Sequence, residues 1–293
     1  MTSGTLRARL LLIAAAALFS TGGAAIKLAT LNAWQVAAFR SAIAAVAILL
    51  FLPAARRAWQ WHYVPVAAAY GATLVLFVSA TKLTTAANAI FLQDAAPLFV
   101  LLLGPLLLHE RIRTSDLVLI VAVACAMLLL FTAEEGVHAT APDPARGNLL
   151  AAVAAITWAL TLVGLRWIGR DASPSGSGGM ATVAFGNLLA SATALPFAFP
   201  VKRFEITDVA VILWLGIFQI GLAYMCLTRG IRSVPAFEAT TLLLLEPALN
   251  PIWSWLIHGE RPAPQSIVAG AIILLATLAN AWWQNRGAVA SVS

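Results

Sequence analysis

The sequence predicts an all-α membrane protein, built from ten transmembrane helices in two inverted five-helix repeats. Three observations lead to this prediction: the composition, the number of apolar segments and one motif that occurs twice. Of the 293 residues, 61% are hydrophobic and only 10% are charged, whereas a soluble domain carries about 25% charged residues. Such a chain is expected to lie in a bilayer, with little of it left for a soluble domain.

Ten apolar segments follow one another along the chain. A helix of about 20 residues spans roughly 30 Å, which is the thickness of the hydrocarbon core. The segments are 10–30, 34–52, 64–82, 86–108, 114–132, 148–167, 178–199, 207–230, 235–257 and 264–284. Arg7 and Arg9 precede the first segment as they would in a signal peptide, but its length favours a retained span.

One motif occurs in both the fourth and the ninth segments: an apolar helix with a central proline, closed by Glu-Arg. A single offset aligns the two copies, which carry Ala89, Pro97, Glu110 and Arg111 in the first and Ala239, Pro247, Glu260 and Arg261 in the second. Four matches at one register indicate a duplicated unit. Each copy also has a second proline, Pro105 or Pro251. Interrupted helices at matching positions indicate a transporter's binding region, although ordinary proline kinks explain them equally well.

A hydrophilic link divides the ten segments into two sets of five. We expect a first repeat at 1–132, a link at 133–147 and a second repeat at 148–293. Because five is odd, the two repeats must enter the membrane in opposite senses. Eleven of the loop arginines and lysines fall on one side of the membrane and five on the other. The side with eleven is predicted to be cytoplasmic, which places both termini inside. A bacterial inner membrane is the expected location.

The sequence also argues against several classes of protein. The net charge of +6 follows from the positive-inside rule, so no nucleic-acid partner is expected. The four histidines and two cysteines lack the spacing of metal ligands, so neither a metal nor a cofactor is predicted. No phosphate-binding loop, dinucleotide-binding glycine pattern or nucleophile elbow is present, so the chain is not expected to be an enzyme.

The repeated proline-containing helix that ends in Glu-Arg resembles the EamA-type transporters of the drug/metabolite transporter superfamily. Phe39 and Arg40, early in the second segment, are also similar to that family. The resemblance covers nearly the whole chain and implies alternating access without ATP. It also implies export of amino acids, aromatic ones among them, or of other small metabolites. The second repeat departs from the pattern, because its second helix carries Phe185-Gly-Asn187 and no arginine.

Ionisable residues inside the spans are costly in lipid, so each is a candidate for function. Arg40 and Asp94 are expected at similar depths, roughly 9 and 12 Å into their helices. They could form an ion pair that either locks the helices or opens for a charged substrate. Glu246, about 16 Å deep, could accept a substrate ammonium, relay a proton or remain a neutral acid bonded to a freed carbonyl. Lys27 is expected to snorkel outward.

Other acidic residues are assigned to structure. Glu110 and Glu260 are expected to hold helix ends or to gate the loops. Glu238 is expected to pair with Arg229 or Arg232.

Polar and aromatic residues near the middle of the membrane form the predicted binding region. Polar groups there can simply bond helices together, and rings can be core packing, but jointly they suit an amino acid. The predicted substrate-binding residues are Ser20, Phe77, Gln93, Asp94, Trp158, Asn187, Gln219 and Glu246. The residues assigned to gating or structure are Arg40, Pro97, Pro247, Glu110 and Glu260. Further candidates for the same region are Asn250, Phe91, Tyr224 and Trp253.

The sequence therefore favours a secondary transporter that exports small amphipathic metabolites by alternating access, with aromatic or apolar amino acids as the leading substrates. The alternative is a multidrug exporter of cationic compounds, which Asp94 and Glu246 would attract. The expected partners are a small-molecule substrate, the lipid bilayer and, as a candidate coupling ion, the proton.

Overall fold

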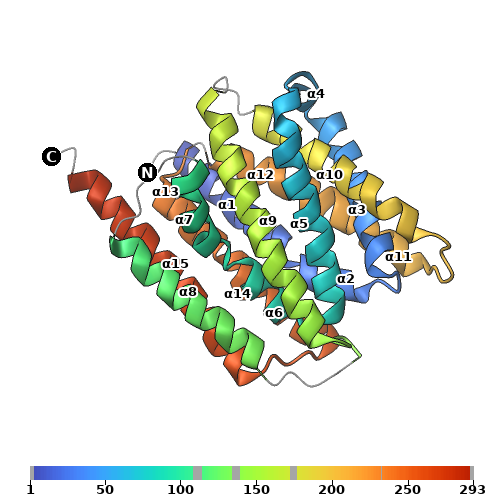
Figure 1. Cartoon of the computed structure of the whole chain (residues 1–293). Coiled ribbons are helices and arrows are strands. Elements are labelled where there is room, and N and C mark those ends of the chain that lie inside the picture. The colour runs from blue at the N-terminus through green and yellow to red at the C-terminus, as the bar shows by residue number, and fades with distance from the viewer. Residues whose placement is uncertain (1–2, 108–113, 134–138, 172–176, 232, 291–293) are drawn as a thin grey trace.

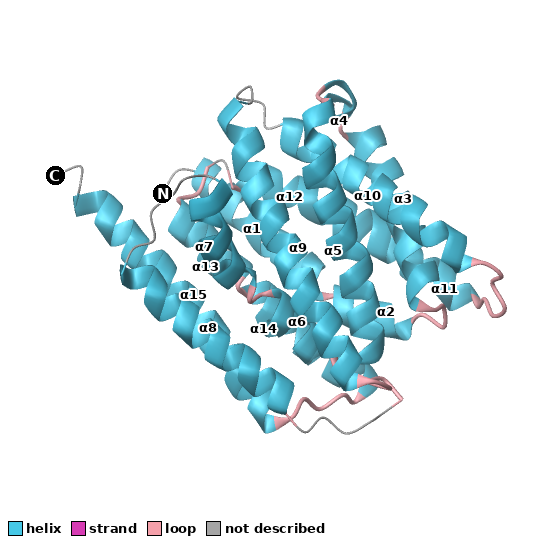
Figure 2. Cartoon of the chain, viewed as in Figure 1, coloured by secondary structure: helices cyan, strands magenta, loops and turns pink. Residues whose placement is uncertain are grey.

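Helices make up nearly all of the secondary structure in the residues that the structure describes. A computed structural model describes residues 3–107, 114–133, 139–171, 177–231 and 233–290. The helices run side by side in one bundle, and both ends of the chain lie at the same end of it (Figure 1). Short loops join them at the two ends of the bundle, and the described part of the chain contains no strand (Figure 2).

The helices follow the order of the apolar segments. Those of the first half are α1 (Ser3–Ser20), α2 (Gly22–Leu28), α3 (Ala33–Phe51), α4 (Pro53–Arg57), the 3-10 helix η1 (Trp61–Tyr63), α5 (Val64–Leu83), α6 (Ala86–Gln93), α7 (Ala96–Leu107) and α8 (Thr114–Thr132). Those of the second half are α9 (Pro144–Asp171), α10 (Ser177–Ala198), α11 (Ile206–Leu213), the π-helix η2 (Trp214–Leu222), α12 (Ala223–Gly230), α13 (Ala236–Leu243), α14 (Leu245–His258) and α15 (Pro264–Ala290).

Eight stretches of helix among the described residues are long and apolar enough to cross a membrane. The fifth expected segment forms a shorter apolar helix, Asp116–Thr132. The ninth is divided between α13 and α14. The prediction of an all-helical protein with several membrane spans is thus confirmed, whereas the count of ten is not established.

Apolar side chains cover the outside of the bundle. Leu106 is 74% exposed, and Leu128 and Leu275 are each 66% exposed. In a soluble protein such exposure would mark an association surface, but on a membrane protein it is the surface that faces acyl chains. Small residues fill the interior, where α5 packs along α9 and α3 along α10. Small side chains let helix backbones approach closely, as is usual within membranes.

The duplicated motif forms two broken helices. The first break is a turn at residues 94–95 between α6 and α7, and the second is at Leu244 between α13 and α14. Pro97 and Pro247 lie in the first turn of the helix that follows each break. Proline has no amide N–H, so the carbonyls of Gln93 and Leu243 lose their helical donors. The α6–α7 and α13–α14 pairs run in opposite directions, the arrangement that an inverted repeat produces (Figure 1).

Two further irregularities were not predicted, and they face each other. The first segment divides at Thr21, between α1 and α2, and the eighth contains the π-helix η2. The Trp214 indole donates to the Thr21 hydroxyl at 3.0 Å, and Gln219 Nε2 donates to the Phe19 carbonyl at 3.5 Å. A Cβ on Gly22 would lie 2.9 Å from Gln219 Nε2. The glycine therefore allows a polar side chain to approach the backbone at the break.

Candidate functional site

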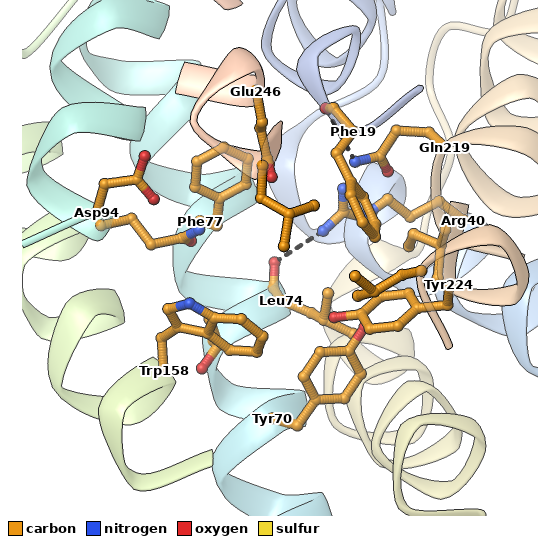
Figure 3. Close-up of a pocket in the computed structure, with 15 residues that line it drawn as sticks. Phe19, Arg40, Tyr70, Leu74, Phe77, Asp94, Trp158, Gln219, Tyr224 and Glu246 are labelled. Atoms are coloured by element: carbon orange, nitrogen blue, oxygen red, sulfur yellow. Dashed lines mark hydrogen bonds between the residues drawn. The ribbon is translucent and has the colours of Figure 1, made fainter. Parts of the chain in front are cut away.

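A cavity of about 170 Å³ lies inside the bundle, where the broken helices meet the π-helix. Its walls come from α1, α3, α5, the α6–α7 break, α9, η2 with α12, and the α13–α14 break. The residues that line it are Phe19, Arg40, Tyr70, Thr73, Leu74, Phe77, Gln93, Asp94, Trp158, Gln219, Ile220, Tyr224, Leu227, Leu243 and Glu246 (Figure 3). Both repeats therefore contribute to one cavity.

The structure brings most of the predicted binding residues to this cavity. Those that line it are Phe77, Gln93, Asp94, Trp158, Gln219 and Glu246. Arg40, which the sequence analysis assigned to gating or structure, lines it as well. Tyr224, a further candidate for its wall, is also present.

Ser20 and Asn187 are at a suitable depth but do not line the cavity. Ser20 is fully buried; its hydroxyl donates to the Ala17 carbonyl at 2.8 Å and accepts from the Trp253 indole at 2.9 Å. Asn187 is also fully buried and donates from Nδ2 to the Val183 carbonyl at 2.9 Å. In this conformation both side chains contribute to helix packing.

An acidic residue lies close to the break in each of the two broken helices. Asp94 lies in the turn that precedes α7, and Glu246 lies in the first turn of α14. The start of a helix carries a partial positive charge, which stabilises a nearby carboxylate. Both carboxyl groups line the cavity. The breaks thus give the cavity an acidic wall.

Arg40 lies on a different side of the cavity from Asp94 (Figure 3). Its side chain is 1% exposed, and Nη2 donates to the Leu74 carbonyl at 3.2 Å. The predicted ion pair between Arg40 and Asp94 was wrong: in the described part of the chain the two line one cavity without pairing. Similar depth on two helices does not bring side chains together when they point to different walls.

Aromatic rings form a continuous wall between these charged groups. Phe19 meets Tyr224 edge-on with ring centroids 5.0 Å apart, and Tyr224 meets Tyr70 at 5.9 Å. Tyr70 in turn lies 6.2 Å from Trp158. This wall offers apolar ring surfaces together with the phenol hydroxyls of Tyr70 and Tyr224.

Apart from Phe77, the contribution of α5 to the cavity was not predicted from the sequence. Tyr70, Thr73 and Leu74 also line it. With Phe77 they are spaced three, four and seven residues from Tyr70, which places them on one face of a helix. This helical spacing of polar and aromatic residues in the sequence could have identified the side of α5 that faces the cavity.

The ends of the bundle hold several of the remaining charged residues. Lys27 does not snorkel outward as expected: its side chain is 2% exposed and Nζ lies 3.3 Å from Glu260 Oε2. Lys27 Nζ also donates to the Thr84 carbonyl at 2.7 Å and to the Thr140 carbonyl. Glu260 Oε1 accepts from the Ala86 amide at 2.6 Å. This Lys27–Glu260 clasp joins the two repeats at the end of the bundle where α6 begins.

At the opposite end of the bundle, one ion pair differs from the prediction. Glu238 pairs with Arg9, and not with Arg229; Arg9 Nη2 donates to its carboxylate at 3.1 Å. Arg232 and Glu110 lie outside the described residues. Among the residues that are described, no group of three His, Cys, Asp or Glu side chains could hold a metal ion.

The fold and the cavity define a helical membrane protein with several spans and an internal polar site shared by two repeats. The model of the EamA-like transporter family matches residues 6–132 and 145–282. The chain therefore belongs to the EamA-like transporter family, and the resemblance seen in the sequence is confirmed.

Individual relatives agree with this assignment. A protein of Methanothermobacter thermautotrophicus, described as an uncharacterized transporter, is 25% identical over 221 residues, which cover 72% of this chain and 61% of that protein. Another uncharacterized transporter, from Clostridium kluyveri, is 28% identical over 75 residues, 26% of this chain and 24% of that protein. The matches thus span less than two thirds of these relatives. A protein of known crystal structure shares the fold with a TM-score of 0.62 at 20% identity, covering 92% of this chain and 94% of that one.

Proposed function

We propose that this protein is a secondary transporter that exports small amphipathic metabolites, with aromatic or apolar amino acids as its substrates. The observation that carries the proposal is the cavity itself, which combines two carboxyl groups, a guanidinium and a wall of rings. At about 170 Å³ it is smaller than the pockets of about 300–1,000 Å³ that hold drug-sized ligands. Its size therefore favours a small metabolite.

The breaks at 94–95 and at Leu244 supply the hinges of the proposed transport cycle. Each break separates a helix into two parts and frees a carbonyl beside the cavity. Two five-helix repeats, 1–132 and 148–293 around a link at 133–147, would rock about these breaks and open the cavity alternately to each side. We place both termini in the cytoplasm, because the positive-inside rule assigns the side with more loop arginines and lysines to the cytoplasm.

Protons are the candidate coupling ion. Asp94 and Glu246 share one cavity, and two close carboxylates in a region of low dielectric constant resist simultaneous ionisation. The pair would release a proton when a substrate ammonium binds, and it would take up a proton when the substrate leaves.

The decisive experiment is uptake of labelled amino acids into proteoliposomes that contain the purified protein. We expect flux of phenylalanine or leucine above that of empty liposomes, and its loss in Glu246→Gln. Asp143→Asn is the matched control, since that acid is exposed and distant in sequence from the cavity residues. Absence of flux for every amino acid tested would refute the proposed substrate class. An imposed pH gradient that leaves the flux unchanged would refute proton coupling alone.

The alternative is export of lipophilic cations, which the acidic wall formed by Asp94 and Glu246 favours. It predicts that cells expressing the protein resist such compounds and that resistance disappears in Glu246→Gln. Resistance without amino-acid flux would replace the first proposal with this one.

A further inference from the structure

The guanidinium of Arg40 has few protein partners for a charge at this depth. The side chain is 1% exposed, and its hydrogen bond is the one to the Leu74 carbonyl. Nε is buried and makes no hydrogen bond to any described residue. Arginine stays protonated in proteins and presents its N–H groups in a planar fork. A cation buried in a membrane is costly unless an anion or several acceptors face it.

Neutral polar groups lie near Arg40. The guanidinium lies toward the phenol groups of Tyr70 and Tyr224, which can donate or accept hydrogen bonds. Gln219, on the neighbouring π-helix, has a buried Oε1 that bonds no described residue. Asp94 lies across the cavity from Arg40, and the Glu246 side chain lies between them in the view of Figure 3. The cavity therefore holds one cation and two acids, with Asp94 on the side away from Arg40.

The backbone fixes this side of the cavity. A Cβ on Gly216 would lie 2.9 Å from the Arg40 carbonyl and 2.6 Å from Ile43 Cγ2. The glycine thus allows α3 and η2 to touch through their backbones. That contact holds Arg40 and Gln219 on adjoining helices at the same wall.

We infer that Arg40 binds the carboxylate of the substrate, while Asp94 and Glu246 receive its ammonium group. The inference rests on the proposed function and narrows its substrates to zwitterions. The planar guanidinium matches a carboxylate with two parallel hydrogen bonds. The side chain of the substrate then lies against the rings of Trp158 and Phe77.

This arrangement discriminates against close analogues that lack one charge. An amine without a carboxylate leaves Arg40 unpaired and places a second cation near it. A carboxylic acid without an amine meets the acidic wall. An analogue that leaves a buried charge of the site without a partner is rejected strongly. An apolar pocket rejects a changed side chain more weakly.

The test compares three ligands of the same ring and chain length. Phenylalanine, phenethylamine and 3-phenylpropionate compete with labelled phenylalanine for uptake into proteoliposomes. We expect the wild type to bind phenylalanine at least about tenfold more tightly than either analogue. In Arg40→Gln the preference for phenylalanine over phenethylamine should fall by about tenfold to a hundredfold, with Arg40→Lys between the two. Arg203→Gln is the control, because Arg203 is 76% exposed and pairs with Glu205 outside the cavity.

The outcomes separate this inference from the function on which it rests. Wild-type flux with equal affinity for phenylalanine and phenethylamine overturns the carboxylate site but leaves amino-acid export standing. An equal loss of both ligands in Arg40→Gln, in protein with an unchanged melting temperature, identifies Arg40 as purely structural. Absence of amino-acid flux in the wild type overturns both. The ligand comparison in the wild type decides the question even where Arg40→Gln does not fold.

Discussion

Ser20 shows how a polar residue at the depth of the cavity can serve packing. Its buried hydroxyl accepts the indole N–H of Trp253. Replacing it with alanine leaves that partly buried N–H without an acceptor, which costs up to about 1–3 kcal/mol. We therefore expect Ser20→Ala to lower the melting temperature in detergent. Ser79→Ala is the control, because the Ser79 hydroxyl bonds only the Val75 carbonyl of its own helix; equal melting temperatures for the two variants would contradict the assignment.

A substitution at Trp158 tests whether the aromatic wall contacts the substrate. Its ring contacts Tyr70 inside the cavity, and aromatic pairs contribute about 0.5–1.5 kcal/mol beyond their buried area. We expect Trp158→Leu to weaken competition by phenylalanine about threefold to tenfold and to leave competition by leucine nearly unchanged. Trp255→Leu, at an indole that is 52% exposed, should alter neither ligand. A parallel loss of both ligands in Trp158→Leu would assign this ring to the fold.

The limits of sequence reasoning at this scale are clear from Ser20, Asn187 and Tyr70. Position along a span gives the depth of a residue, because the rise of a helix is constant. It does not give the side to which the residue points, which depends on how neighbouring helices pack. Ser20 and Asn187 were therefore chosen by depth and turned out to face helix contacts, while Tyr70 was overlooked on the cavity face of α5.

The Lys27–Glu260 clasp joins elements of the two repeats. Both side chains are less than 5% exposed, so removing one partner strands the other charge in a buried site. Breaking such a pair costs about 3–5 kcal/mol, whereas exposed pairs contribute about 0–1 kcal/mol. We expect Glu260→Gln and Lys27→Met each to lower the melting temperature markedly, and the double variant to recover part of the loss. Arg203→Gln, at an exposed pair, should change little; additive losses in the double variant would argue against coupling.

The broken helices give a second prediction at the scale of elements. Replacing Pro247 with alanine restores an amide N–H that can bond the Leu243 carbonyl and continue the helix across the break. We expect Pro247→Ala to raise the melting temperature or leave it unchanged, and to reduce flux at least about threefold, because the hinge is lost. Pro53→Ala, at the exposed start of α4, is the control. Unaltered flux in Pro247→Ala would show that the break is not a hinge.

The sequence indicated some of these element features and not others. Pro97 and Pro247 marked the two breaks because proline acts locally, through its own missing N–H. The break at Thr21 and the π-helix η2 depend instead on contacts between the two repeats, through Trp214 and Gln219. Such irregularities are set by tertiary packing, which no local pattern encodes.

The orientation of the whole molecule can be tested by labelling. The positive-inside rule places Arg56 in the cytoplasm and Arg261 on the outer side, and both side chains are exposed. With Cys125 and Cys226 replaced by alanine, we expect a membrane-impermeant maleimide to label Arg261→Cys in intact cells. Arg56→Cys should react only after the membrane is permeabilised. Reaction of both variants from the same side would exclude the inverted arrangement.

At this scale the sequence was most informative. A single repeated motif and an odd number of segments per half led to the arrangement in which α6–α7 and α13–α14 run oppositely (Figure 1). The number of spans was harder to define, because the fifth segment forms a helix shorter than a full span and the ninth is divided between α13 and α14.

The single guanidinium of Arg40 has a consequence for the symmetry of the cavity. Arg40 comes from the first half, and the second helix of the other half offers Asn187 in the corresponding stretch. Two copies of the first half would surround the cavity with a pair of guanidiniums, and two copies of the second would provide none. A cavity with a single guanidinium therefore requires two halves that differ in sequence.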